Sequence, residues 1–425
     1  MLNIAIAGLG TVGAGVVRML RANTELITAR AGKPITIKAV SARDKNKKRD
    51  CDLHGIEWVD DPRKLAQMPG IDVVVELIGG ASDPARELAE ATLNNGKHLV
   101  TANKALLATH GTALAQLAEK NKKQLSYEAS VAGGIPIIKT MREALAGNRI
   151  TSVRGILNGT CNYILTRMGQ SGLAFDAALK EAQQKGYAEA DPSADIDGHD
   201  TAHKIAILAA LAFGAAPDAA SVTVAGIRNI EPVDLQFAEE FSSRIRLLGI
   251  ARLMDGKLEQ HVCPVLVPKS LPLAQVSGAL NAVMLQGDFA GDLMLEGQGA
   301  GSDPTASSVV SDIIDIARGN FTHAFGVPAS KLKKLDKAAA QSTQRYYIRL
   351  KVKDKPGVVA DISAVLRDEA ISIESLLQRG RSATDSVSVV IITHPARSDA
   401  IHRAADKIAR VGTVVEKPCL LPIEE

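Results

Sequence analysis

The segment 186–204 gathers carboxylates and a lysine in a pattern that suits proton transfer. Asp200 and Lys204 are four residues apart, so both lie on one face of a helix that begins near Gly198. The helix continues as the almost wholly apolar run 205–213, which predicts that the pair is partly buried. A lysine held by an aspartate at such a place suits proton transfer, whereas the plainer alternative is an exposed helical ion pair. Four further acidic residues crowd the preceding loop: Glu189, Asp191, Asp195 and Asp197.

The same helix carries His199 and His203 one turn apart, as in the zinc-binding helix of a metalloprotease. A zinc site needs a third ligand and normally a glutamate base, and this chain has Asp200 instead. The zinc alternative is therefore not favoured.

A second motif, Gly8-x-Gly10-x-x-Gly13, follows an apolar strand at residues 2–7 and opens a helix that extends to about residue 30. In this context the glycines let the backbone approach a pyrophosphate, and the N-terminus of the helix stabilises its charge. A purely structural glycine turn is the alternative. The motif predicts a dinucleotide cofactor, NADP or NAD.

The second strand, at 36–41, bears on the choice between these cofactors. It leads into Ser41-Ala42-Arg43, with no Asp or Glu just there to hold a ribose 2′-hydroxyl. Arg43, helped by Lys45 or Lys47, would instead hold a 2′-phosphate, which favours NADP. The basic run 45–49 is otherwise an ordinary solvated loop.

Two domains with different patterns of strands and helices must position these residues. Over the first part of the chain, strands and helices alternate, which predicts an α/β fold with a parallel, doubly wound, Rossmann-type sheet. After Gly133-Gly134 the pattern becomes that of a separate α+β domain, in which Asp255-Gly256 predicts a hairpin turn of type I′. The expected strands are 2–7, 36–41, 72–78, 98–101, 151–157, 222–227, 244–254 and 258–267, with helices at 83–95 and 136–146.

The C-terminal residues predict a small ferredoxin-like module. Its expected elements are strand 345–353, helix 358–369, strand 371–379, strand 385–393, helix 397–410 and strand 412–419. Before it, the glycine turn 297–301 and helix 305–318 return to the nucleotide domain. We therefore divide the chain into a Rossmann domain at 1–135 with 300–325, a substrate-binding, catalytic and dimerisation domain at 136–299, a polar linker at 328–344, and the C-terminal module at 345–425.

Composition excludes several classes of protein. Aromatic residues make up only 3% of the chain, which counts against nucleic-acid recognition by stacking. The longest apolar run, 205–216, is too short to span a bilayer, and the N-terminus reads as a strand and not as a signal peptide. The four cysteines form no CxxC pair, which favours a reducing cytoplasm over a disulfide framework.

These motifs together resemble the homoserine dehydrogenase family over about residues 1–325. The long family signature has a helical alanine, a Gly-aromatic pair and then Asp-Pro, Asp, Gly, Asp and Lys at fixed spacing. It is matched by Ala182, Gly186-Tyr187, Asp191-Pro192, Asp195, Gly198, Asp200 and Lys204. Other matching segments are the N-terminal glycine motif, Thr101–Lys104, Tyr127–Ile135, Asn158–Tyr163 and Gly297–Gly301.

The resemblance implies the NAD(P)-linked interconversion of L-homoserine and L-aspartate 4-semialdehyde, in threonine, methionine and isoleucine synthesis. In that reaction Lys204 would be the proton donor in the reducing direction, Asp200 would orient it, and Lys104 would lie near nicotinamide and substrate. Glu189, Asp195 and Thr160 would position the substrate. Cofactor contacts are expected from Gly8, Gly10, Thr11, Val12, Gly13, Arg43, Lys104 and Gly301.

The family also has a sodium site. Its match here is the carboxylate or carbonyl of Glu128 with backbone carbonyls near Val131, Gly133 and Ile135. Hard oxygen ligands of this kind suit such an ion. From the residues alone, Glu128 would be an ordinary polar residue at the end of a strand.

The C-terminal module, with Lys353-Asp354-Lys355-Pro356-Gly357, resembles the ACT domains, which usually bind amino acids. The pathway implied above makes threonine the expected effector, and an inert oligomerisation module is the alternative. The whole chain would form a homodimer or a homotetramer.

Two other functions compete with this interpretation. An amino-acid sensor with an inactive dehydrogenase body would not need to keep Lys104, the pair Asp200 and Lys204, and the glycine turn together. Another amino-acid or semialdehyde dehydrogenase is disfavoured by the residues from Glu189 to Lys204. The choice between NADP and NAD stays open.

Overall fold

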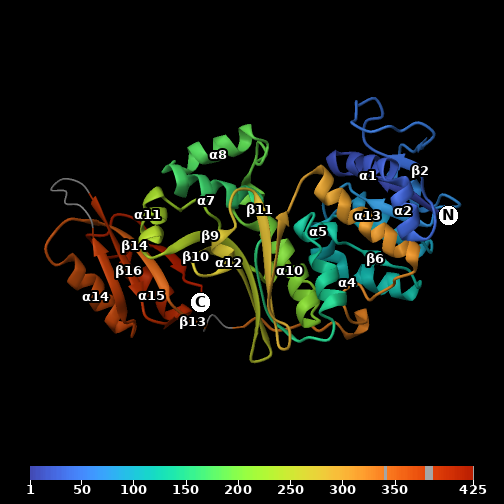
Figure 1. Cartoon of the computed structure of the whole chain (residues 1–425). Helices are drawn as coiled ribbons and strands as arrows, with labels where there is room; N and C mark the ends of the chain where they lie inside the picture. The colour runs from blue at the N-terminus through green and yellow to red at the C-terminus, as the bar shows by residue number, and fades with distance from the viewer. Residues whose placement is uncertain (339–341, 379–385, 425) are drawn as a thin grey trace.

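Six parallel strands form the sheet of the N-terminal lobe, in the order β3-β2-β1-β4-β5-β6. The computed structural model describes residues 1–338, 342–378 and 386–424, and its three lobes lie in a row (Figure 1). The strands are β1 (Leu2–Ala7), β2 (Ile35–Ser41), β3 (Glu57–Trp58), β4 (Val73–Glu76), β5 (His98–Thr101) and β6 (Leu125–Ser126). The helices of this lobe are α1 (Thr11–Ala22), α2 (Thr24–Ala31), α3 (Ala85–Asn94), α4 (Lys104–Lys120), α5 (Ala129–Ala132) and α13 (Ser302–Arg318), with a 3₁₀ turn at Pro62–Ala66.

Helix α13 lies beside α1 although nearly 300 residues separate them in sequence (Figure 1). The absence of a side chain at Gly15 permits this approach, because a Cβ there would lie 2.8 Å from Ser302 Oγ and 3.1 Å from Ala306 Cβ. Apolar residues of the two helices and of β1 form one buried core. The chain therefore re-enters the N-terminal lobe after it has formed the middle lobe.

The middle lobe contains a mixed sheet in the order β12-β11-β7-β9-β10-β8. Its strands are β7 (Ile150–Ile156), β8 (Thr223–Val224), β9 (Ser243–Met254), β10 (Lys257–Pro268), β11 (Leu280–Gly287) and β12 (Gly291–Gln298). Its helices are α6 (Ile137–Lys139), a π-helical turn at Thr140–Ala144, α7 (Gly159–Ser171), α8 (Phe175–Gln184), α9 (Ser193–Ile196), α10 (His199–Phe213), a 3₁₀ turn at Ala219–Ser221, α11 (Pro232–Glu240) and α12 (Pro272–Gln275).

The sequence predicts one hairpin of the middle sheet and does not predict another. The Asp255-Gly256 turn between β9 and β10 is confirmed, since its residues have φ angles of +50° and +76°. The hairpin of β11 and β12 is not among the expected strands, although β11 pairs with β7 inside the sheet.

The C-terminal lobe has a four-stranded antiparallel sheet in the order β15-β16-β14-β18, with two helices. Its elements are β13 (Thr343–Gln344), β14 (Tyr346–Lys353), α14 (Val358–Asp368), β15 (Ile373–Gln378), β16 (Ser386–Thr393), β17 (Ala396–Arg397), α15 (Ser398–Ile408) and β18 (Cys419–Pro422), preceded by a 3₁₀ turn at Ala329–Lys331. Residues 339–341 of the expected linker, residues 379 and 385 at the ends of two expected strands, and residue 425 lie outside the described residues.

The last strand begins later than the sequence pattern suggests. The expected strand at 412–419 is wrong in position, because β18 occupies Cys419–Pro422 and only Val414 forms an isolated bridge to β14 before it. Pro418 explains the difference, since proline has no N–H to donate to a ladder and regular pairing starts after it. The predicted fold class is otherwise confirmed: a Rossmann-type sheet, an α+β domain and a ferredoxin-like module.

Buried ionic contacts attach the C-terminal lobe to the middle lobe. Asp234 of α11 is fully buried and accepts hydrogen bonds from Tyr347 Oη at 2.8 Å and from Arg349 Nε at 2.7 Å. On the other side, Glu424 Oε1 accepts from Arg154 Nη1 of β7 at 2.6 Å and from Arg252 Nη2 of β9 at 2.7 Å. Side chains of both lobes also share one apolar core. The C-terminal lobe is therefore fixed against the sheet of the middle lobe by these contacts as well as by the linker.

Among the described residues, no helix is both long and apolar enough to cross a membrane.

Candidate active site

Asp200 and Lys204 lie one turn apart at the start of α10. The helix follows Gly198, whose φ of +89° and whose close approach to Val224 exclude a side chain at that point. Lys204 Nζ donates to Asp200 Oδ2 at 2.7 Å and to the Leu157 carbonyl oxygen at 2.7 Å. The two side chains are only 9% and 11% exposed, so the pair is buried, and the alternative of an exposed helical ion pair is excluded.

A second lysine reaches the same carboxylate from the nucleotide-binding lobe. Lys104 Nζ lies 2.9 Å from Asp200 Oδ1. Lys104 is the first residue of α4, directly after the carboxyl end of β5, and Asn103 fixes this start. The Asn103 side chain accepts a hydrogen bond from Leu106 N and donates one to Gly80 O. One aspartate therefore binds a lysine on each oxygen, and the two lysines come from two lobes.

The charges in this cluster determine its protonation. Burial alone would raise the pKa of Asp200, but the charges of Lys204 and Lys104 and their hydrogen bonds hold that pKa well below its usual range. Burial lowers the pKa of Lys104, but the carboxylate of Asp200, with smaller contributions from Asp195 and Glu189, outweighs it and raises the pKa. Asp200 is therefore a carboxylate and Lys104 a cation at neutral pH.

Asn158 joins this cluster to the loop of acidic residues. It caps α7 through Oδ1, which accepts from Cys161 N at 2.9 Å. Its Nδ2 donates to Asp195 Oδ1 at 2.8 Å and to Asp200 Oδ2 at 2.9 Å. Thr160 Oγ1 donates to the Tyr187 carbonyl at 2.6 Å and lies 3.1 Å from Asp195 Oδ2. Asp195 and Thr160, two of the residues expected to position the substrate, are thus brought together with Asp200.

Among the described residues, the side chain of Glu189, also predicted to position the substrate, has no such hydrogen bond. It is exposed on the loop between α8 and α9, and its carbonyl accepts from Gln183 Nε2. Asn158, conversely, is absent from the residues predicted to act in the site. An asparagine between a strand and a helix indicates only a helix cap in sequence, and its second role depends on the distant Asp200.

The glycine turn between β1 and α1 has the shape that a dinucleotide needs. Gly8 has a φ of +102°, and a Cβ on it would lie 2.4 Å from Leu77 O. A Cβ on Gly13 would lie 2.0 Å from Gly8 O, so Gly13 lets the helix pack closely on the turn. In contrast, no described atom lies within 4 Å of a Cβ position on Gly10, which leaves its backbone open to a ligand. Thr11 and Val12 follow as the first residues of α1. This cradle fits a pyrophosphate.

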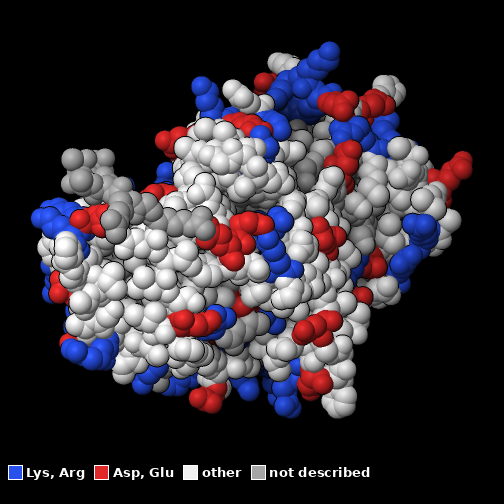
Figure 2. All heavy atoms as spheres, turned by 60° about the vertical axis from the view of Figure 1, so that its left-hand side comes forward, with Lys and Arg blue, Asp and Glu red and all other residues white. Residues whose placement is uncertain are grey.

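Arg43 and Gly301 both lie next to this turn. Ser41 at the end of β2 accepts a hydrogen bond from Gly8 N at 2.8 Å, and the exposed Arg43 follows two residues later. Gly301 precedes α13, whose Ser302 Oγ donates to Thr11 O at 2.9 Å. In Figure 2 basic side chains, with some acidic ones, gather on the top of the molecule, where the loop after β2 projects in Figure 1.

The backbone around Glu128 offers oxygen atoms to a cation, but the Glu128 carboxylate is already occupied. Its two oxygens accept hydrogen bonds from Ile138 N and Lys139 N, each at 2.8 Å. Burial, together with the nearby Asp312, raises the pKa of Glu128 to about 7, and burial raises the pKa of Asp312 to about 6. Of the carbonyl oxygens predicted at 128, 131, 133 and 135, that of Gly133 accepts a hydrogen bond from Ser308 Oγ at 2.6 Å and that of Ile135 accepts one from Ile137 N at 2.8 Å. A carbonyl oxygen has two lone pairs, so each keeps one for a hard cation such as sodium, and the carbonyl of Glu128 is free of the contacts that its carboxylate makes.

His199 and His203 do not gain a third metal ligand. Among the described residues, no group of three or more His, Cys, Asp or Glu side chains is placed to hold a metal ion.

Comparisons with known proteins place the chain in a family. The family model described as homoserine dehydrogenase matches residues 136–314, that of the homoserine dehydrogenase NAD binding domain matches residues 8–128, and the ACT domain model matches residues 346–412. A homoserine dehydrogenase of Neisseria gonorrhoeae is 44% identical, with 98% of this chain and 97% of the relative covered. One of Pseudomonas aeruginosa is 42% identical, with coverage of 92% and 91%.

Solved structures give the same result. The crystal structure of a homoserine dehydrogenase from Thiobacillus denitrificans is 40% identical and superposes with a TM-score of 0.93, covering 100% of this chain and 98% of that chain. A hyperthermophilic archaeal homoserine dehydrogenase in complex with NADPH is 28% identical, with a TM-score of 0.64 and coverage of 76% and 99%. Sequence, fold and site geometry agree, and the chain belongs to the homoserine dehydrogenase family.

Proposed function

We propose that the chain interconverts L-homoserine and L-aspartate 4-semialdehyde with NAD(P), in the synthesis of threonine, methionine and isoleucine. The observation that carries this proposal is the buried Asp200, which binds Lys204 and Lys104 from two lobes. Lys104 follows the carboxyl end of β5, and the glycine turn follows that of β1. In parallel sheets ligands bind at this edge, so the lysines and the nucleotide turn lie on the same side of the sheet.

Each side chain then has a defined role. The bound nicotinamide supplies or accepts the hydride at the substrate carbonyl carbon. Lys204 gives a proton to the carbonyl oxygen in the reducing direction; two of its three N–H donors bind Asp200 and Leu157, and the third remains for the substrate. Asp200 holds both lysines in position, and Lys104 places its charge between nicotinamide and substrate.

The acidic loop binds the amino-acid end of the substrate. Asp195 and Glu189 suit its ammonium group by charge, and Thr160 fixes Asp195 through a contact of 3.1 Å. Asn158 adds a positioning contact, because it connects Asp195 to Asp200.

One assay tests the proposed reaction. Homoserine oxidation is measured with NADP and with NAD, each with and without L-threonine. We expect activity with at least one nucleotide and a lower rate with threonine present. An enzyme that leaves homoserine unchanged with both nucleotides would exclude the proposal.

The proposed preference is for NADP, through Arg43. Arg43→Ala should weaken NADP binding by about 1.5–3 kcal/mol, which is typical of a hydrogen bond to a charged group, and should weaken NAD binding less. Titration of both nucleotides against both proteins measures the difference. Equal losses for NADP and NAD would mean that Arg43 does not contact the 2′-phosphate.

We also propose sodium at the carbonyls of Glu128, Val131, Gly133 and Ile135. When sodium chloride replaces choline chloride at equal ionic strength, the midpoint of unfolding should rise, because a ligand that binds the native state stabilises it. The rise should increase with pH, because Glu128 and Asp312 ionise as pH passes about 6 to 7 and then attract a cation. Identical midpoints in the two salts at pH 8 would count against the site.

The remaining parts of the proposal concern the whole chain. Threonine is the proposed effector of the ACT module, a homodimer or homotetramer the proposed assembly, and the cytoplasm the proposed location, with no nucleic acid or membrane as partner. The four cysteines are free thiols, which is consistent with a reducing compartment. The proposed domain boundaries are those of the sequence analysis. They are 1–135 with 300–325 for the Rossmann domain, 136–299 for the substrate-binding domain, 328–344 for the linker and 345–425 for the ACT module.

A further inference from the structure

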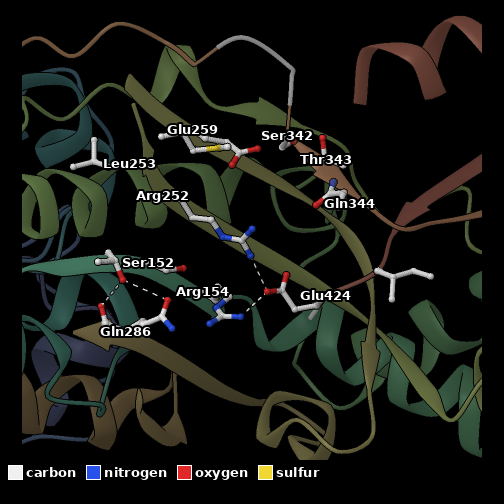
Figure 3. Close-up of a pocket in the computed structure, with 13 residues that line it drawn as sticks. Ser152, Arg154, Arg252, Leu253, Glu259, Gln286, Ser342, Thr343, Gln344 and Glu424 are labelled. Carbon is white, nitrogen blue, oxygen red and sulfur yellow. Dashed lines mark hydrogen bonds and ion pairs between the residues drawn. The ribbon is translucent and has the colours of Figure 1, made fainter. Parts of the chain in front are cut away.

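A pocket of about 410 Å³ lies between the sheet of the middle lobe and the last linker residues before the ACT module. Figure 3 shows its lining: strands β7, β9 and β10 supply one side, and Ser342, Thr343 and Gln344 the other. The volume is within the range of small-molecule sites. It is separate from the cluster of Asp200 and Lys204 and from the Pro-Gly turn of the ACT module.

The pocket contains charges of both signs, and two of them, Arg252 and Glu259, do not pair with each other. Arg252 and Glu259 are opposite each other in the β9–β10 ladder, where cross-strand side chains normally meet. Arg252 instead donates to Glu424 Oε1 at 2.7 Å, and together with Arg154 it converges on that carboxylate (Figure 3). A guanidinium has five N–H donors, so Arg252 keeps donors for a ligand.

Glu259 is left without a matching donor. Its Oε2 is buried and has no hydrogen-bond partner among the described residues, and its Oε1 lies 3.9 Å from His261 Nδ1. Burial lowers the pKa of His261, so the imidazole is neutral at pH 7 and is no counter-ion. Ser152 Oγ, also in the pocket, is buried and likewise has no partner in the part of the chain that the structure describes. Buried polar atoms are seldom left unsatisfied, since each costs about 1–3 kcal/mol.

We propose that this pocket binds a zwitterionic α-amino acid, with the carboxylate of the ligand on Arg252 and its ammonium group on Glu259. The two arginines and two glutamates of the pocket balance in formal charge, which suits a ligand that is neutral overall but carries separated charges. An inorganic anion would leave Glu259 without a partner. Ser152 Oγ and Gln286 supply polar contacts for a small side chain.

The pocket includes residues of β7, and the residue that follows this strand binds Lys204. Ser152 and Arg154 belong to β7, and the same strand leads directly to Leu157, whose carbonyl binds Lys204, and to Asn158, which binds Asp200. A ligand that shifts β7 would therefore act on the proton-transfer pair. This inference rests on the proposed amino-acid regulation of the enzyme and gives that regulation a site outside the ACT turn.

The test is calorimetry on the full-length enzyme with L-threonine, L-serine, L-isoleucine and L-methionine. At least one of the four amino acids should bind. Its amide, which lacks the carboxylate charge, and its N-acetyl derivative, which lacks the ammonium charge, should each bind at least about tenfold more weakly. Glu259→Gln, which keeps the side-chain shape, should weaken binding by a similar factor. The control Asp255→Asn, on the exposed turn of the same hairpin, should leave it unchanged.

The outcomes separate this site from its alternatives. Homoserine oxidation without added amino acid should be the same in Glu259→Gln as in the wild type. A wild type that does not oxidise homoserine would be a failure of the proposed function, and it is distinguished from a failure of this site, which the binding measurements report. The inference is overturned if none of the four amino acids binds, or if Glu259→Gln binds like the wild type. It is also overturned if Asp361→Asn, beside the ACT turn, weakens binding while Glu259→Gln does not.

Discussion

Lys204→Ala should lower kcat for homoserine oxidation by about 10²-fold or more while the protein stays folded. The expected size is that of lost acid–base catalysis. Lys204 has contacts of 2.7 Å to Asp200 and to Leu157, which fix its Nζ beside the carboxylate. Alanine removes the proton-transfer group. KM for homoserine should change much less than kcat, because Asp195 and Thr160 remain.

Two further variants distinguish catalysis from structure. Lys204→Arg keeps a positive charge and hydrogen-bond donors, but a guanidinium does not release its proton at neutral pH, so it should not restore the rate. Lys180→Ala, at an exposed lysine of α8, should behave like the wild type. Near wild-type turnover in a folded Lys204→Ala enzyme would refute the assignment of Lys204.

Asp234→Ala should destabilise the chain by about 3 kcal/mol or more. The fully buried carboxylate accepts from Arg349 Nε and Tyr347 Oη. A lost hydrogen bond to a charged group costs about 1.5–3 kcal/mol, and the buried hydroxyl that remains costs about 1–3 kcal/mol. Arg349 keeps its contacts with the partly exposed Glu231 and Glu416, which limits the loss. Urea unfolding measures the change.

A matched control comes from the same helix. Glu239 is exposed and pairs with Lys269, so Glu239→Gln should change stability by no more than about 1 kcal/mol. If Asp234→Ala were as stable as Glu239→Gln, the buried contacts would not hold the ACT module on the catalytic lobe. If it were destabilised as expected, the module would be an integral part of the fold.

Local sequence signals predict much of the fold and part of the site. The glycine turn has a φ of +102° at Gly8, and the helix that begins with His199 carries Asp200 and Lys204 on one face. These features follow from the conformational freedom of glycine and from helical spacing. The same reasoning finds the turn at Asp255-Gly256.

Contacts between distant segments are what the sequence cannot predict. The approach of Lys104 to Asp200 joins two lobes and has no local signature. The role of Asn158 depends on two carboxylates, at 195 and 200, that are far along the chain. The Glu128 carboxylate, a predicted sodium ligand, is turned to the backbone of α6 by two hydrogen bonds, which only the packed structure reveals.

The hairpin of β11 and β12 lies outside the expected strands for a related reason. Its residues form a pair of strands because β11 adds to β7, so tertiary pairing stabilises it more than its own pattern does.

The central claim, that this site transfers hydride between homoserine and nicotinamide with Lys204 as the proton-transfer group, has a direct test. Homoserine deuterated at C4 is incubated with NADP and the enzyme, and the reduced nucleotide is examined by NMR. The account predicts deuterium at C4 of the nicotinamide ring, together with L-aspartate 4-semialdehyde, for the wild type, and at most about 1% of that rate for Lys204→Ala. Reduced nucleotide without deuterium, or equal transfer by the two enzymes, would contradict it.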